Sequence, residues 1–210
     1  DTPMESAWRD ARIARIYEGT NEINRMLSVG MLVKKAMKGH VDLLGPASEV
    51  QAELMGIPSF ETPDYSELFA EEKEMIGKLK KAFLMVAGGA VQKYGPDLDG
   101  HQQLLMAAAD ILIEIYMAES TILRTEKLAK TKGEAAVKEQ IAMAQLYLYK
   151  AVDIITQKGK EGIVSFAEGD EQRMMLMGLR RYTKYTNMPN VIGLREIITS
   201  KLVAENAYCF

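Results

Sequence analysis

A carboxylate, a glycine and a hydroxyl follow one another at a break between two helical stretches near the start of the chain. Glu18 lies in the break and not on a helix surface, so its carboxylate is expected to point outward from a rigid support. Gly19 adds no side-chain bulk, and Thr20 is a residue type preferred as the N-cap of the next helix. The first N–H groups of a helix have no acceptor within it. These three residues form a candidate site for a ligand that must approach the backbone.

The two histidines do not form a metal site in the sequence. His40 follows a helix-ending glycine, and His101 opens a helix beside Gly100. Neither has a carboxylate or a second histidine three or four residues later, and no Glu-x-x-His pair exists that would favour a di-metal bundle. Gly-x-Ser-x-Gly, Walker and Gly-x-Gly-x-x-Gly patterns are also absent from the sequence. The sequence therefore predicts no metal ligands and no nucleophile elbow.

Other polar residues favour structural roles over chemistry. Asp110 interrupts an apolar helix, so its carboxylate needs a partner or a wet flank, and a paired structural role is favoured over a catalytic one. Arg180, Arg181 and Lys184 form a basic cluster late in a helix, where compensation of the helix dipole and solvation are favoured over phosphate binding. Cys209 is expected to be an idle thiol.

The chain is predicted to be all-α. A first helix begins at Thr2-Pro3 and reaches about residue 14, and a second covers about 21–38 and stops at Gly39. Residues 40–71 are interrupted by Gly-Pro and Pro-Asp pairs, which predicts a linker with one short helix over 48–55.

An up-down antiparallel helical bundle is expected from residue 72 onward. Apolar residues recur at alternating steps of three and four, the spacing of helices that cross at small angles. These seams are Ile76, Leu79, Phe83, Val86 and Ala90; Leu104, Ala108, Ile111, Ile115, Ala118 and Ile122; and Val137, Ile141, Ala144, Leu148, Ala151 and Ile155. Short breaks separate these stretches, so neighbouring helices should run antiparallel. Further helices are predicted over 170–185 and 190–204.

Composition excludes several classes of protein. The chain has 210 residues, with 26 Lys and Arg against 29 Asp and Glu, a net charge of −3. Hydrophobic residues make up 48%, which excludes a disordered chain, and the lack of basic excess argues against nucleic-acid binding by bulk charge. One cysteine excludes a disulfide framework within the chain. The chain starts with Asp1 and has no signal segment, so we expect it to be part of a longer protein.

The segment around the break resembles the acyl-CoA dehydrogenase family. The resemblance rests on Arg-Asp-Ala-Arg-Ile at 9–13 and Tyr-Glu-Gly-Thr-Asn-Glu-Ile at 17–23, which are similar to the late signature of that family's catalytic region. It implies that Glu18 is the general base that removes the α-proton of an acyl-CoA thioester, while the β-hydride passes to N5 of FAD and leaves a trans-2-enoyl-CoA. It also implies that Gly19 lies against the substrate. Such a base should be well placed and desolvated.

The same resemblance implies that Thr20, Asn21 and Glu22 lie along the flavin. The signature covers residues 1–39, which should be the last helices of the catalytic domain, followed by the linker 40–71. Residues 72–210 are similar to the appended C-terminal helical bundle of the very-long-chain type and its bacterial relatives. That similarity is carried weakly by 100–105, Asp110 and Tyr116.

For the full-length protein, the resemblance implies FAD as cofactor, electron-transfer flavoprotein as acceptor, a homodimer and a role in fatty-acid β-oxidation. The 210 residues alone are expected to bind FAD weakly or not at all and to be inactive, because other domains of the family supply most contacts. The protein is expected in the cytoplasm, or in the mitochondrial matrix or at the inner-membrane face if it is eukaryotic.

Two alternatives stay open. One is an acyl-CoA oxidase on the same scaffold. The other is a helical module for dimerisation, membrane-surface docking or partner binding without catalysis of its own. Membrane docking is disfavoured because residues 40–71 are acidic, which opposes anionic lipid. The acidic residues are Glu53, Glu61, Asp64 and Glu67.

Overall fold

A computed structural model describes residues 3–56 and 64–210, and these residues contain helices and no strand. The helices are α1 (Met4–Ile13), α2 (Asn21–Met37), α3 (Leu44–Met55), α4 (Ala70–Tyr94), α5 (Gln102–Lys132), α6 (Lys138–Phe166), α7 (Gly169–Tyr182) and α8 (Val191–Glu205). Two short 3₁₀ helices, η1 (Gly95–Gly100) and η2 (Glu134–Val137), connect α4 to α5 and α5 to α6. The predicted all-α class is confirmed.

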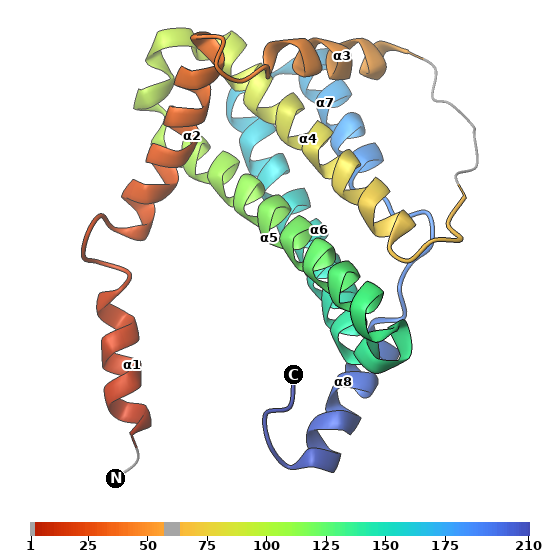
Figure 1. Cartoon of the computed structure of the whole chain (residues 1–210). Helices are drawn as coiled ribbons and strands as arrows, with labels where there is room; N and C mark the ends of the chain where they lie inside the picture. Colours follow the sequence, from red (N-terminus) through yellow and green to blue (C-terminus); the bar gives the residue numbers. More distant parts are fainter. Residues whose placement is uncertain (1–2, 57–63) are drawn as a thin grey trace.

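The centre of the molecule is an up-down bundle of α4, α5, α6 and α7 (Figure 1). α2 packs on α5, α3 lies across α4 and α7, and α8 contacts α6. In Figure 1, α1 continues below α2 at the left and α8 lies below the ends of α5 and α6 at the right, and neither helix has a buried residue. Within the described residues, no helix combines the length and apolarity that crossing a membrane requires.

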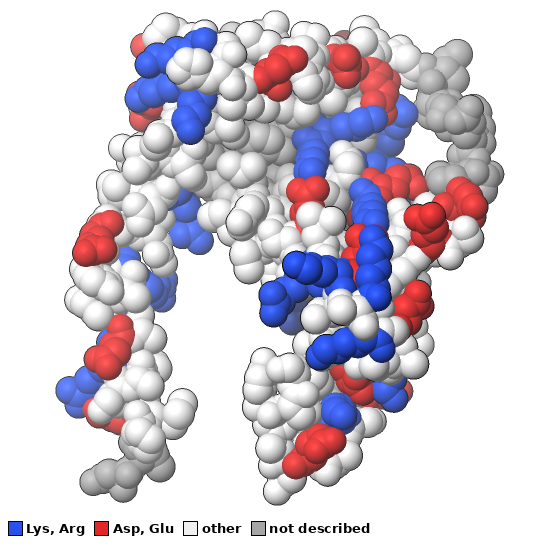
Figure 2. Space-filling model, viewed as in Figure 1, with Lys and Arg blue, Asp and Glu red and all other residues white. Residues whose placement is uncertain are grey.

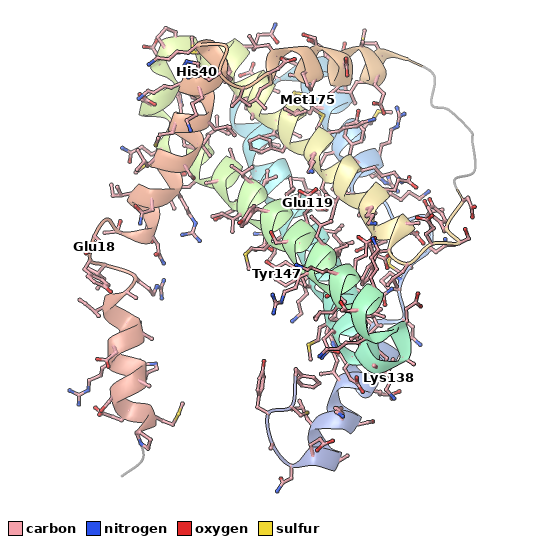
Figure 3. The ribbon with its side chains drawn as sticks, viewed as in Figure 1. Glu18, His40, Glu119, Lys138, Tyr147 and Met175 are labelled. Atoms are coloured by element: carbon pink, nitrogen blue, oxygen red, sulfur yellow. The ribbon has the colours of Figure 1, made fainter. Side chains whose placement is uncertain are left out.

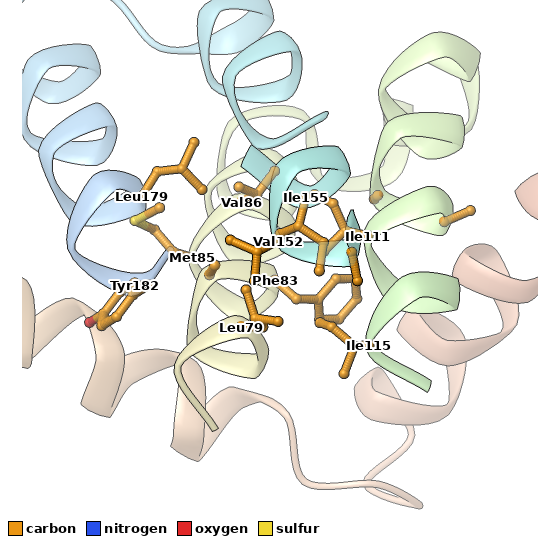
Figure 4. Close-up of a cluster of buried hydrophobic side chains, with 14 of the residues drawn as sticks. Leu79, Phe83, Met85, Val86, Ile111, Ile115, Val152, Ile155, Leu179 and Tyr182 are labelled. Carbon is orange, nitrogen blue, oxygen red and sulfur yellow. The ribbon is translucent and has the colours of Figure 1, made fainter. Parts of the chain in front are cut away.

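The predicted seams form the core. Every seam residue of α4 and α5 is buried, and so are those of the η2–α6 stretch except Ile141, which is partly buried and packs against the core. Figure 4 shows side chains from α4, α5, α6 and α7 meeting around Val86, Ile111 and Ile155. Alternating steps of three and four place these residues on one face of each helix, which explains why the bundle could be predicted.

The observed helix ends differ from the predicted ones by one to four residues, and three of these differences are instructive. α3 begins at Leu44 and not at residue 48, because Gly45-Pro46 lies in its first turn, where proline is favoured, and Asp42 Oδ1 accepts a bond from the Gly45 N–H at 3.0 Å. α7 ends at Tyr182, three residues early. α8 begins at Val191, because Asn190 is its N-cap and accepts from the Gly193 N–H at 3.1 Å. The predicted start at Thr2 and the breaks at 57–63 lie outside the described residues.

Tyr182, at the end of α7, predicts a loss of stability in alkali. Its side chain is 2% exposed, and its hydroxyl has no hydrogen-bond partner among the described residues. Burial, followed by the charge of Glu53, raises the pKa of Tyr182 from 10.0 to about 12. The folded state therefore holds this proton more tightly than the unfolded state, and the stabilisation is lost as the pH rises from about 10 towards 12.

Phenylalanine at position 182 should remove this sensitivity. We expect Tyr182→Phe to leave the free energy of unfolding at pH 7 unchanged or slightly higher, because it deletes an unpaired buried hydroxyl. At pH 11.5 the variant should be more stable than the native chain by about 2 kcal/mol. Urea unfolding at both pH values measures this. Tyr208→Phe, at a position that is 85% exposed, is the matched control, and an equal effect of the two substitutions would contradict the prediction.

Candidate functional site

The break between α1 and α2 has an unusual backbone. Glu18 has φ +56° and Gly19 has φ +93°, so two consecutive residues occupy the left-handed region. That region is uncommon for a residue with a Cβ. A Cβ built on Gly19 would lie 2.7 Å from Asn24 Oδ1, so both the backbone angle and the space favour glycine there. The sharp turn separates Glu18 from both helices, as the sequence predicted.

Hydrogen bonds fix this turn to the start of α2. Thr20 Oγ1 accepts from the Ile23 N–H at 3.2 Å, which confirms the predicted N-cap. Asn24 Nδ2 donates to the Gly19 carbonyl at 2.9 Å, and the Asn21 N–H donates to the Arg15 carbonyl at 3.2 Å. The loop is therefore held by bonds to both of its neighbouring segments.

Glu22 carries a stabilised negative charge in the first turn of α2. Its pKa is lowered, first by a hydrogen bond from its own backbone N–H and then by the Thr20 hydroxyl, with smaller contributions from Arg15 and Arg25. An acid at this position also faces the positive end of the helix dipole. The three residues predicted to lie along a flavin thus sit together in one capped helix start.

Glu18 is exposed, which differs from the desolvated surroundings expected of a strong base. Figure 3 places it in the loop between α1 and α2, apart from the bundle. Apolar side chains on either side of it in the sequence are also exposed: Ile16, Tyr17, Ile23 and Leu27 are each more than half exposed. The loop therefore presents a carboxylate within an apolar surface that the described residues do not cover.

Arg25 joins this loop to the bundle, a link that sequence reasoning missed. Its Nε donates to Asp110 Oδ1 of α5 at 2.7 Å, and its Nη1 donates to the Asn21 carbonyl at 3.3 Å. Lys158 Nζ of α6 lies 4.0 Å from Asp110 Oδ2. The prediction that Asp110 is a paired structural residue is confirmed. One carboxylate of the bundle therefore connects, through Arg25, to the start of α2.

We expect the Arg25–Asp110 pair to contribute about 1 kcal/mol to stability, because a charged hydrogen bond is strong but both side chains are partly exposed. A double-mutant cycle of Arg25→Met and Asp110→Ala, followed by urea unfolding, measures this coupling. The matched control is Lys80–Glu119, a more exposed pair that joins α4 to α5, with an expected coupling below about 0.5 kcal/mol. Equal coupling energies for the two pairs would contradict the prediction.

The other candidate residues do not join the loop. His40 is exposed, and His101 stacks on Tyr94 with ring centroids 3.5 Å apart. In the part of the chain that the structure describes, no group of acidic, histidine or cysteine side chains could hold a metal ion.

The basic cluster late in α7 has a role that the sequence did not predict. Arg181 donates to Glu53 Oε1 of α3 at 3.2 Å, so solvation and compensation of the helix dipole do not fully explain this cluster. The separation of 128 residues left no local signal for this bond.

The bundle and the loop between α1 and α2 are both similar to segments of known proteins. Two family models, both described as the acyl-CoA dehydrogenase C-terminal domain, match residues 1–31 and 78–181. The chain belongs to the acyl-CoA dehydrogenase family. It is 39% identical over 202 residues to a probable acyl-CoA dehydrogenase of Bacillus subtilis (strain 168), a match that covers 96% of this chain and 34% of the relative.

A solved structure shows the same arrangement. The crystal structure of an acyl-CoA dehydrogenase complexed with FAD from Bacillus anthracis has a TM-score of 0.91 to this chain and 40% sequence identity. The match covers 100% of this chain and 35% of that protein. The chain therefore spans about a third of the length of these two relatives.

Proposed function

We propose that this chain is the base-carrying C-terminal part of an FAD-dependent acyl-CoA dehydrogenase of fatty-acid β-oxidation, which converts an acyl-CoA to a trans-2-enoyl-CoA. The observation that carries the proposal is the left-handed Glu18–Gly19 turn at the capped start of α2, within a stretch that matches the family. In this proposal Glu18 is the general base, Gly19 lies against the thioester, and Thr20, Asn21 and Glu22 lie along the flavin.

The chemistry follows from the residues of the loop. The Glu18 carboxylate takes the proton from the α-carbon, so it must lie within hydrogen-bond reach of that proton. Gly19 leaves the backbone open to the thioester because it has no Cβ. Bound FAD would supply the acceptor for the hydride that leaves the β-carbon. The start of α2 is suited to one edge of a flavin. The Thr20 cap fixes its backbone, and exposed apolar side chains lie next to that backbone.

The exposed apolar side chains near Glu18 support the proposal that other segments of the whole enzyme cover this loop and complete the site. Water must be excluded from the base during proton removal, and the described residues leave Glu18 exposed. We therefore propose that the 210-residue chain alone holds FAD weakly or not at all and has no dehydrogenase activity. The absorbance of the purified chain near 450 nm tests this, and a yellow preparation with one flavin per chain would contradict it.

The proposed reaction is tested on the whole enzyme with an acyl-CoA substrate and an artificial electron-accepting dye. Dye reduction that requires both the substrate and bound FAD supports the proposal, and its absence over a range of acyl chain lengths would refute it. Hydrogen peroxide formation at a rate that matches substrate loss would instead show an acyl-CoA oxidase. Reduction of electron-transfer flavoprotein by the same preparation tests the proposed physiological acceptor.

A role in assembly is the second candidate, and exposed apolar side chains on α1 and near α8 favour it. Trp8 is 66% exposed, and Val203 and Tyr208 are 74% and 85% exposed. Exposed apolar side chains that form a contiguous patch mark interaction surfaces. We propose a homodimer of the whole enzyme, which sedimentation equilibrium tests; this role is compatible with catalysis.

The two relatives are bacterial, so we propose that the enzyme is cytoplasmic, and no observation supports the mitochondrial alternative.

A further inference from the structure

An apolar cavity lies between the C-terminal half of α2 and the helices α3, α4 and α7. Its volume is about 390 Å³. Its walls include Val29 and Val33 of α2, Leu54 of α3, Phe83 and Gly88 of α4, and Met175 of α7. This volume is within the range of small-molecule sites, roughly 300–1,000 Å³. In Figure 2, the surface between α2 and α4, below α3, is largely free of charged side chains.

Polarity divides the cavity into an apolar interior and a polar mouth. The polar lining residues Ser48, Gln51, Gln92 and Glu171 are all exposed, so they belong to the mouth. Glu171 is the only charged side chain among the described residues that line the cavity. A charged group in the interior would therefore find no partner, and its desolvation would oppose binding. The inner part of an occupant must be uncharged and apolar.

The walls also select against an extended peptide. Nearly all lining residues lie inside helices, whose backbone N–H and C=O groups already bond to each other. An extended peptide inserted there would bury its own backbone groups without partners, whereas a hydrocarbon has none to satisfy. Phe83 is the one aromatic residue among the described residues of the lining, so stacking of a flat ring is not favoured over aliphatic packing.

Methionines make the cavity adaptable. Met37, Met85, Met174 and Met175 line it from three helices, and their unbranched, polarisable side chains fit ligands of different shape. Gly88 adds space on the α4 wall, because a Cβ built there meets only the Ala47 Cβ, at 3.6 Å. We propose that this cavity binds the hydrocarbon chain of a single-chain lipid, whose polar end stays at the mouth in water.

The proposal is tested with 1-decanol as the probe and the 210-residue chain labelled with ¹³C at its methionine methyl groups. We expect saturable shifts of the Met85 and Met175 methyl signals, while Met188, which lies outside the cavity lining and is 70% exposed, stays unchanged. Signals that do not saturate, or that move equally at Met188, would overturn the proposal.

Two variants narrow the cavity, and one matched variant does not. Gly88→Leu should weaken 1-decanol binding by about tenfold or more, because the new side chain takes up ligand space. Val33→Phe should do the same from the α2 wall, which keeps the test decisive if one variant fails to fold. Gly77→Leu is the control: Gly77 lies on the same helix, is exposed, and has nothing within 4 Å of a built Cβ. Equal affinity of folded Gly88→Leu and Gly77→Leu would overturn the proposal.

Discussion

Replacing Glu18 by glutamine should lower kcat of the proposed enzyme by about 10²- to 10⁴-fold, the usual contribution of a general base. Glutamine has the same shape, but its amide cannot accept the α-proton. The two side chains have nearly the same size and glutamine is uncharged, so the substitution adds neither bulk nor a buried charge to the completed site. The thermal unfolding midpoint and the flavin content should therefore match those of the native enzyme. Steady-state dye reduction at saturating acyl-CoA measures the loss.

The control for this experiment is Glu49→Gln, which removes an exposed carboxylate from α3 and should leave kcat unchanged. Near-normal turnover of Glu18→Gln would show that Glu18 is not the base. A lost flavin or a lowered unfolding midpoint would instead show that Glu18 supports the structure of the loop. The three results are distinguishable within one set of measurements.

Truncating Ile155 to alanine should destabilise the chain by about 2–5 kcal/mol, a large fraction of the 5–15 kcal/mol typical of a domain. Ile155 is 0% exposed, and Figure 4 shows it among side chains from the neighbouring helices of the bundle. Removing three carbon atoms there loses their burial and leaves a cavity, because the surrounding helices relax only partly. Urea unfolding followed by circular dichroism measures the change in the free energy of unfolding.

Ile154 provides a matched control on the same helix. It is 38% exposed, so Ile154→Ala should cost about 1 kcal/mol or less. Both variants change isoleucine to alanine within α6, so the gain in helix propensity is shared and does not affect the comparison. Similar losses for the two variants would contradict the burial pattern of the bundle.

The bundle could be predicted from sequence because local spacing determines which face of a helix is apolar. Leu79, Ile111 and Leu148 were assigned to the core on that ground, and all three are 0% exposed. The Thr20 cap could be predicted for the same reason, since its bond reaches only three residues ahead. The start of α3 could not be predicted from the sequence, because a Gly-Pro pair fits both a loop and the first turn of a helix.

Contacts between distant segments had no such signal. The need of Asp110 for a partner was clear, but its partner Arg25 lies 85 residues away, and only the packing of α2 on α5 brings them together. The break at Glu18 and the outward direction of its carboxylate were predicted, whereas its left-handed backbone was not, and the desolvation implied by the resemblance is not seen in this chain. Exposure depends on which surfaces surround the loop, and a residue pattern alone does not specify those surfaces.

The left-handed backbone of Glu18 has a consequence for how the protein tolerates genetic change. A residue with a Cβ at φ +56° is strained by about 1–2 kcal/mol, and glycine at that position would relieve the strain. Under the proposed function the same replacement would remove the base. A mutation of Glu18 to glycine can therefore raise stability while it abolishes activity, so drift towards a more robust fold and retention of catalysis oppose each other at this residue.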